Sequence, residues 1–205
     1  MEYIKHLSRD ARLRKLLATA EPYQLKRRRN ICTYLCASIM SQQLSVRVAD
    51  VIYGRFIDLF GGRQPQPQQI LDTPDATLRA IGLSNAKASY VKNVAQFEIE
   101  KGMGARKLNK MSNEEVIGYL TPIKGVGRWT VEMLLMFALG REDVFAPDDL
   151  GIQQAMIHLY KLDGSDKKKL REDMLRISAR WSPYRTYACI HLWRHKDNPP
   201  PLKNS

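Results

Sequence analysis

The chain has 205 residues, and 44% of them are hydrophobic, which is enough to bury a sizeable core as one domain or two small lobes. Lysine and arginine total 33 against 21 aspartate and glutamate, which gives a formal net charge of +12. Such an excess attracts polyanions, and nucleic acid is the commonest of these. Three cysteines are too few for a secreted disulfide framework, and they complete no metal-binding pattern.

Neither a secretion signal nor a membrane span is visible in the sequence. Residues 1–10 contain no apolar stretch of the signal-peptide kind. The longest apolar run, 131–139, contains Glu132 and is too short to cross a bilayer. We therefore expect an intracellular protein with no membrane partner, in the cytoplasm or nucleoid, or in the nucleus of a eukaryote.

Apolar residues recur at helical spacing along the whole chain. They repeat at three- and four-residue steps over 44–59, and again over 84–102. Ser112 followed by Glu115 has the form of a capping box, which predicts the start of another helix. No alternating stretch flanked by turn residues indicates a hairpin of strands. The predicted class is all-α.

Segment 120–131 is the most informative part of the chain. Two glycines lie between the helix that Ser112 opens and an apolar helix expected over 128–139, so we predict a tight turn between helices. The second helix would begin with unpaired N–H groups and the positive end of its dipole, which together bind phosphate without reading sequence. The alternative is an ordinary helix–helix turn. The residues assigned to the phosphate site are Lys124, Gly125, Gly127, Arg128 and Thr130.

Two adjacent aspartates open a further helix. Pro147 precedes Asp148 and Asp149, and apolar residues at helical spacing follow from Ile152. An aspartate in this position commonly caps the helix. One aspartate suffices as a cap, so the other can point into a cleft, where the helix dipole keeps it ionised. The spacing alone does not say which aspartate has which role.

Taken together, these motifs resemble the helix–hairpin–helix, glycine/proline-rich, aspartate (HhH-GPD) superfamily of DNA glycosylases, and most nearly its 3-methyladenine DNA glycosylase II branch. The resemblance runs over most of the chain, and the combination of hairpin, spacing and Pro-Asp-Asp is far more specific than a lone Gly-x-Gly. Its main motifs lie at 39–46, 123–130, 144–152 and 181–187.

The resemblance implies two helical lobes with a DNA-binding cleft between them. The central lobe would span 38–139 and contain the helix–hairpin–helix at about 112–139. The second lobe would combine 1–37 with 140–205 and carry the catalytic aspartate at the junction. Larger bacterial members have an additional N-terminal β-rich domain, and we expect the compact, wholly helical form here.

Matched to the family's motif, Asp149 is the catalytic carboxylate and Asp148 is left as the helix cap. A fixed anion beside C1′ of a flipped nucleotide stabilises the oxocarbenium charge that develops as the N-glycosidic bond breaks. Asp149 can also orient the attacking water, and the sequence does not separate these roles. Trp129 stands where lyase-active members have a Schiff-base lysine. The resemblance therefore implies a monofunctional hydrolase.

Alkylated purines such as 3-methyladenine and 7-methylguanine are cationic, so an aromatic pocket can select them by stacking and cation–π attraction. By the resemblance, Trp129 and Trp193 line this pocket. Tyr184 and Tyr187 are further candidates, for which core packing is an equal alternative.

Extruding a base leaves a gap in the duplex that a side chain must fill. The loop 41–44 matches the family's intercalating loop, with Gln43 as the best candidate and Leu44 as the next. The alternative for Leu44 is that it is the first core residue of the following helix.

No cofactor is expected beyond a structural Na⁺ or K⁺, which the resemblance places on the backbone carbonyls of Ile123 and Gly125. The expected partner is double-stranded DNA containing a damaged base, bound by a monomer with no obligate protein partner. Two alternatives stay open. A glycosylase for other damaged or mismatched bases is disfavoured by Trp129, and by the lack of the four cysteines that hold an iron–sulfur cluster in some relatives. A non-catalytic DNA-binding module is disfavoured because two aspartates in a DNA-facing cleft would repel phosphate.

Overall fold

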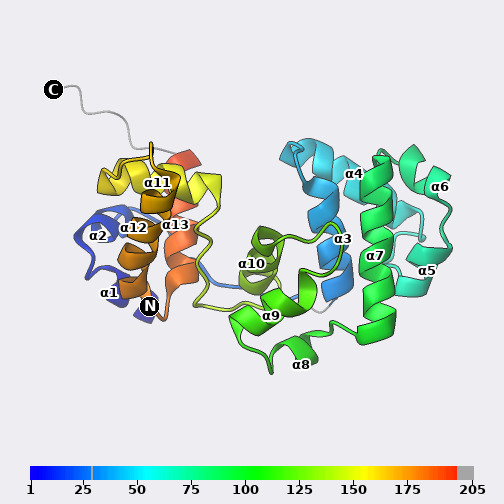
Figure 1. The fold of residues 1–205 in the computed structure, drawn as a ribbon, viewed down its shortest axis with the longest axis horizontal. Helices are drawn as coiled ribbons and strands as arrows, with labels where there is room; N and C mark the ends of the chain where they lie inside the picture. The colour runs from blue at the N-terminus through cyan, green and yellow to red at the C-terminus, as the bar shows by residue number, and fades with distance from the viewer. Residues whose placement is uncertain (29, 198–205) are drawn as a thin grey trace. The chain divides into compact units, whose positions relative to one another are not determined.

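The computed structural model describes residues 1–28 and 30–197, and within this part of the chain all regular secondary structure is helical (Figure 1). The predicted all-α class is confirmed. The chain divides into two compact units. We call 26–139 the central unit, and 1–25 with the described residues from Gly140 onward the terminal unit.

The central unit is built around α7, the long green helix of Figure 1, which packs against α3 on one side and α5 on the other. α3 is almost wholly apolar and must be covered by its neighbours, which are α4, α7 and α10. The helices of this unit are α3 (Ile31–Ser41), α4 (Val46–Asp58), α5 (Pro67–Asp72), α6 (Asp75–Ala80), α7 (Asn85–Lys101), α8 (Ala105–Leu108), α9 (Asn113–Leu120) and α10 (Arg128–Phe137).

In the terminal unit, α13 packs against α11 and α2, and η1 packs against α12. Two segments far apart in the sequence thus form this unit, because α1 and α2 share a core with the helices that follow Gly140. The helices are α1 (Glu2–Leu7), α2 (Ala11–Leu17), α11 (Leu150–Tyr160), α12 (Lys167–Ser178), the 3-10 helix η1 (Ala179–Trp181) and α13 (Arg185–Asp197).

The domain boundary differs from the predicted one. The division expected between 37 and 38 falls inside α3, whereas the central unit of the structure begins at Lys26. Leu35, Cys36 and Ile39 of α3 are fully buried, so the whole helix belongs to one core. Residues 198–205, which the prediction included in the second lobe, lie outside the described residues.

Several helix starts follow from local chemistry. The capping box of Ser112 and Glu115 opens α9 as predicted. α4 begins later than the apolar pattern indicated, at Val46, because the hydroxyl of Ser45 accepts the N–H of Val48. Leu44 therefore precedes the helix and is 37% exposed, so it is not the first core residue.

No described helix of the chain is long and apolar enough to cross a membrane.

Candidate active site and DNA interface

Asp149 caps α11. Its backbone is extended, with φ −72° and ψ 122°, and its Oδ1 accepts the N–H of Ile152 at 2.8 Å. Asp148 lies one residue too early to reach the first turn. Its carboxylate pairs instead with Arg171 of α12, Nε to Oδ1 3.2 Å, and remains 52% exposed. The prediction that Asp148 is the cap is therefore wrong, and Asp149 has that position.

Asp149 is held by a second donor as well. The indole N–H of Trp193, on α13, donates to the same Oδ1 at 2.8 Å. Asp149 and Trp193, two of the predicted site residues of the terminal unit, are thus in direct contact. One donor comes from the helix that the carboxylate caps and the other from a neighbouring helix, so the orientation of the carboxylate is fixed from two directions. The N-terminal end of α11 also favours negative charge at this point.

Gly151 makes this contact sterically feasible. A Cβ at Gly151 would lie 3.0 Å from Cδ1 of Trp193 and 3.1 Å from Oδ1 of Asp149. Without a side chain there, the edge of the indole lies against the first turn of α11. The sequence analysis did not predict a role for Gly151, because the only signal was a glycine two residues after the predicted catalytic aspartate.

The loop that leads to Asp149 is fixed to the start of α13. Arg185 donates to both oxygens of Asp143, at 2.6 Å from Nε and 2.9 Å from Nη2. Burial opposes ionisation of Asp143, but hydrogen bonds from Arg185 and Ser182 outweigh it, so the pKa of Asp143 is below its usual value. The hydroxyl of Thr186 adds a bond to the carbonyl of Arg141 at 2.6 Å. None of these anchors was predicted, because they join residues far apart in sequence.

Tyr184 and Tyr187 contact α1. The ring of Tyr187 stacks on Tyr3 with centroids 4.0 Å apart, and its hydroxyl donates to Glu142 at 2.8 Å. The ring of Tyr184 meets His6 edge to face, at 5.4 Å between centroids. These contacts favour the alternative interpretation of both tyrosines, in which they pack the N-terminal helix onto α13.

The helix–hairpin–helix consists of α9 and α10 with the glycine turn between them. Gly125 has φ +101°, and a Cβ there would overlap the ring of Tyr90. Gly127 is the N-cap of α10 with ordinary extended backbone, and a Cβ on it would meet open space. Gly125 is thus required by packing and conformation, whereas Gly127 leaves the N-terminus of α10 accessible.

The predicted phosphate ligands differ in what they present. Lys124 is exposed, whereas the side chain of Thr130 is buried, so Thr130 offers only its backbone N–H. The guanidinium of Arg128 is bound within the motif, to Glu114 of α9 at 2.5 Å and to the buried Glu132 of α10 at 3.1 Å. Arg128 therefore joins the two helices through its side chain, which leaves its backbone N–H for the predicted phosphate contact.

The carbonyls predicted to hold a monovalent cation accept hydrogen bonds. The Ile123 carbonyl accepts the N–H of Val126 at 2.9 Å, and the Gly125 carbonyl accepts Nε2 of Gln42 at 3.3 Å. Each oxygen has a second lone pair, so the donor set still fits Na⁺ or K⁺. The cation stays a prediction.

The loop with the predicted intercalating residues is a type II β-turn. Gln42 has φ −52° and ψ 129°, Gln43 has φ +58°, and the N–H of Leu44 donates to the carbonyl of Ser41 at 3.1 Å. The third position of this turn normally holds glycine. A glutamine there costs about 1 kcal/mol of backbone strain. Gln43 is exposed at the tip of the turn.

Trp129 lies in the first turn of α10, next to the N–H groups predicted to bind phosphate, and is 43% exposed. It belongs to the central unit, whereas Trp193 belongs to the terminal unit.

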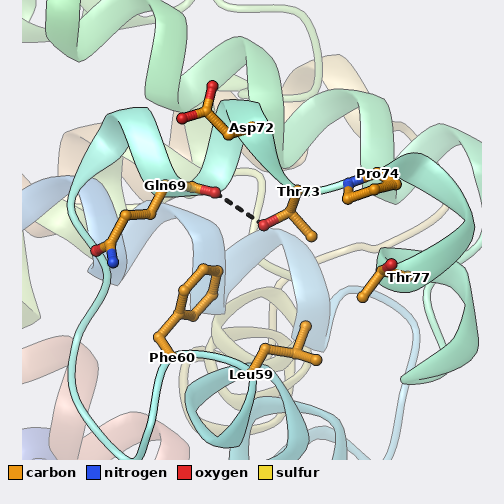
Figure 2. A pocket seen from close by; sticks show the side chains of 7 residues that line it. All are labelled: Leu59, Phe60, Gln69, Asp72, Thr73, Pro74 and Thr77. Carbon is orange, nitrogen blue, oxygen red and sulfur yellow. Dashed lines mark hydrogen bonds between the residues drawn. The ribbon is translucent and has the colours of Figure 1, made fainter.

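A surface hollow of about 420 Å³ lies elsewhere in the central unit, beside α5 and α6 (Figure 2). Asp72 is its only charged lining residue, and the hydroxyl of Thr73 donates to the carbonyl of Gln69. None of the predicted site residues lines it, so it is not the candidate site.

Comparison with known proteins gives consistent results. The family model of the HhH-GPD superfamily of base excision DNA repair proteins matches residues 36–180. "DNA-3-methyladenine glycosylase 1" of Schizosaccharomyces pombe is 36% identical over 185 residues, which cover 89% of this chain and 80% of that protein. "DNA-3-methyladenine glycosylase" of Saccharomyces cerevisiae is 32% identical, over 78% of this chain and 64% of that protein.

Two solved structures have the same fold at similar identity. A DNA-3-methyladenine glycosidase from Bacillus halodurans has a TM-score of 0.84 at 35% identity, covering 97% of this chain and 90% of that one. Schizosaccharomyces pombe 3-methyladenine DNA glycosylase (Mag1) in complex with abasic DNA has a TM-score of 0.82 at 34% identity, covering 96% and 97%. The chain has the hairpin and the helix-capping aspartate, and it matches this family model and these relatives. It belongs to the HhH-GPD superfamily of base excision DNA repair proteins.

Proposed function

We propose that the protein is a monofunctional DNA glycosylase that hydrolyses the N-glycosidic bond of flipped-out alkylated purines, of the 3-methyladenine and 7-methylguanine type, and leaves an abasic site. It acts as a monomer on double-stranded DNA. The observation that carries the proposal is the Asp149 carboxylate, held by the first turn of α11 and by the indole of Trp193. The relatives named above are described as DNA-3-methyladenine glycosylases.

Asp149 stabilises the charge that forms on the sugar. As the bond between C1′ and the base nitrogen lengthens, positive charge spreads over C1′ and the ring oxygen. A carboxylate that is already oriented stabilises this charge without reorganising. The two hydrogen bonds to Oδ1 supply that orientation.

Trp193 places an aromatic surface beside this carboxylate. Its N–H is engaged with Asp149, so the indole has a fixed position next to the group that stabilises the sugar. A cationic alkylpurine is attracted to such a ring by about 0.5–2 kcal/mol more than a neutral base. The leaving group then needs little protonation, which suits a site whose chemistry rests on one carboxylate.

Trp129 bears on the fate of the DNA strand after base release. An indole cannot form a Schiff base with C1′, so water is the nucleophile and the DNA backbone is not cleaved by the protein. The product is therefore an intact strand with an abasic site, which breaks only on treatment with alkali.

The central unit supplies the contacts to DNA. The N–H groups at the start of α10 bind a phosphate, and Lys124 adds positive charge beside them. Gln43, at the tip of its strained turn, fills the gap left by the extruded base. A strained backbone of this kind persists where neighbouring contacts enforce it, and such residues cluster at functional sites. The strain therefore supports Gln43, rather than a residue with an unstrained backbone, as the side chain that fills the gap.

The test is base release from methylated duplex DNA, with strand breakage scored before and after alkali. Asp149→Asn is the informative variant because asparagine is as good an N-cap as aspartate and still accepts from Ile152 and Trp193. We expect it to fold and to bind abasic DNA but to release no base. Asp148→Asn is the matched control, since it removes an exposed carboxylate paired with Arg171. An Asp149→Asn variant with native activity would overturn the assignment.

A further inference from the structure

The turn Ser41–Leu44 is held on its helix side by a half-buried lysine. Lys87, in the first turn of α7, donates from Nζ to the carbonyl of Met40 at 3.0 Å and to the carbonyl of Gln42 at 2.7 Å. These carbonyls lie at the C-terminal end of α3, where helical partners are lacking. Burial lowers the pKa of Lys87, which agrees with an ammonium group taken partly out of water.

A side chain of the turn itself reaches the hairpin. Nε2 of Gln42 donates to the carbonyl of Gly125 at 3.3 Å. Gln42 thus has its own carbonyl bound by Lys87 and its side-chain amide bound to the glycine turn. The loop with Gln43 and the turn that opens α10 are therefore linked through one residue.

Helix α7 supports both segments with one face. Lys87 holds the type II turn, the Tyr90 ring packs under Gly125, and Asn93 donates from Nδ2 to the carbonyl of Lys124 at 3.3 Å. Residues at three-residue steps lie on the same side of a helix. The stripe Lys87, Tyr90 and Asn93 therefore forms a common base for the two predicted DNA-contacting segments.

The strain at Gln43 indicates that this support is needed. A left-handed backbone at a residue other than glycine is kept only where neighbouring contacts over-determine it. The residue before it, Gln42, is anchored at its carbonyl and at its side chain, and the two anchors come from different elements. Without them the turn can relax to another conformation, and its tip then loses its position relative to the hairpin.

We infer that Lys87 and Gln42 are positioning residues for base extrusion, which hold the turn so that Gln43 enters the duplex in fixed register with the phosphate bound at the hairpin. This inference rests on the proposed function. A turn that is ordered before binding avoids the loss of conformational freedom that a mobile one undergoes on DNA. The two residues act through Gln43 and contact neither the lesion nor C1′.

The experiment compares the variants Lys87→Met and Gln42→Leu with two control variants in α7. Lys92→Met removes a lysine paired with Asp75, and Gln96→Leu removes a glutamine bonded to Glu100. Affinity is measured for a duplex with an abasic site and for the same duplex undamaged. Gln42→Leu loses one hydrogen bond, and we expect it to bind abasic DNA about three- to tenfold more weakly. Lys87→Met loses two, and we expect its loss of affinity to be larger, roughly tenfold or more. Binding to undamaged DNA and the thermal midpoint should match the controls.

Amide hydrogen exchange in the free protein provides a readout that needs no DNA. In both test variants exchange should be faster at 42–45 and unchanged in α9 and α10. Lys87→Arg keeps the donors and should restore slow exchange and the preference for abasic DNA. Unchanged exchange at 42–45, or an equal loss of affinity for both duplexes, overturns the inference. If the native protein releases no base, the proposed function fails, while the exchange result still decides whether the turn is anchored.

Discussion

The hydrogen bond between Trp193 and Asp149 can be removed without removing the aromatic ring. Trp193→Phe keeps a ring in α13 but has no N–H, so the carboxylate loses this donor and keeps the one from Ile152. Two consequences oppose each other. The lost donor leaves more negative charge on the carboxylate, which favours the sugar cation, but it also frees the carboxylate to rotate out of position.

The magnitudes favour the second effect. A hydrogen bond to a charged group contributes about 1.5–3 kcal/mol, and a misplacement of about 1 Å in a catalytic group costs roughly a hundredfold in rate. We therefore expect base release by Trp193→Phe to be slower by about ten- to a hundredfold in a single turnover, with affinity for abasic DNA little changed. Gly151→Ala should act similarly, because its Cβ would lie 3.0 Å from the indole and displace it.

Single-turnover release of 7-methylguanine from duplex DNA measures this effect, with thermal unfolding as the check on folding. Trp193→Ala separates the N–H from the ring, since it removes both and should be slower still. If Trp193→Phe releases base at the native rate or faster, the orienting role of the indole N–H is refuted. In that case charge on the carboxylate, and not its position, limits the rate.

Three further predictions concern the hairpin, the strained turn and a buried histidine. Gly125→Ala should lower the thermal midpoint and abolish DNA binding together. The new Cβ would overlap Tyr90, and the φ of +101° at this position is unsuited to alanine. A stable variant that binds DNA would contradict this prediction. Gln43→Gly should relieve about 1 kcal/mol of backbone strain and so raise the thermal midpoint by about 2–4 °C. The same variant should bind abasic DNA more weakly, and a lower midpoint would argue against strain in the turn. Burial lowers the pKa of His191 to about 4, so protonation favours the unfolded state and stability is lost as pH falls from about 6.5 towards 4. The thermal midpoint of His191→Phe should therefore depend less on pH across that window than the midpoint of the native protein. An equal pH dependence in the two proteins would contradict this role of His191.

The sequence predicts helix starts and turns that depend on a few neighbouring residues. The capping box at Ser112, the start of α7 after Ser84 and the glycine turn each depend on a few adjacent residues. The same locality explains the error at the aspartates. Two identical side chains in sequence satisfy the same pattern, and only the backbone of Asp149 shows which one lies directly before the first helical residue.

Contacts between residues far apart in the sequence could not be predicted from such local patterns. The family resemblance predicts Trp193 in the site, but not its bond to Asp149, which joins α13 to the start of α11. For Tyr187, the sequence is equally consistent with a place in the base pocket and with packing in the core. Its stacking on Tyr3 depends on how the N-terminal helix packs against α13. An aromatic residue at helical spacing has the same sequence pattern in both cases.

The double role of Oδ1 in Asp149 limits how this chain can change over evolutionary time. One atom begins α11 and also belongs to the proposed catalytic group, so most replacements at 149 remove a helix cap and the chemistry in the same step. Asparagine, serine and threonine are the exceptions among residues that cap with a side chain, because they start a helix without carrying a charge. A descendant that lost base removal through a change at 149 and kept this side-chain cap would therefore carry one of these three residues. Under the proposed function, such a descendant would keep the affinity for DNA that the central unit supplies.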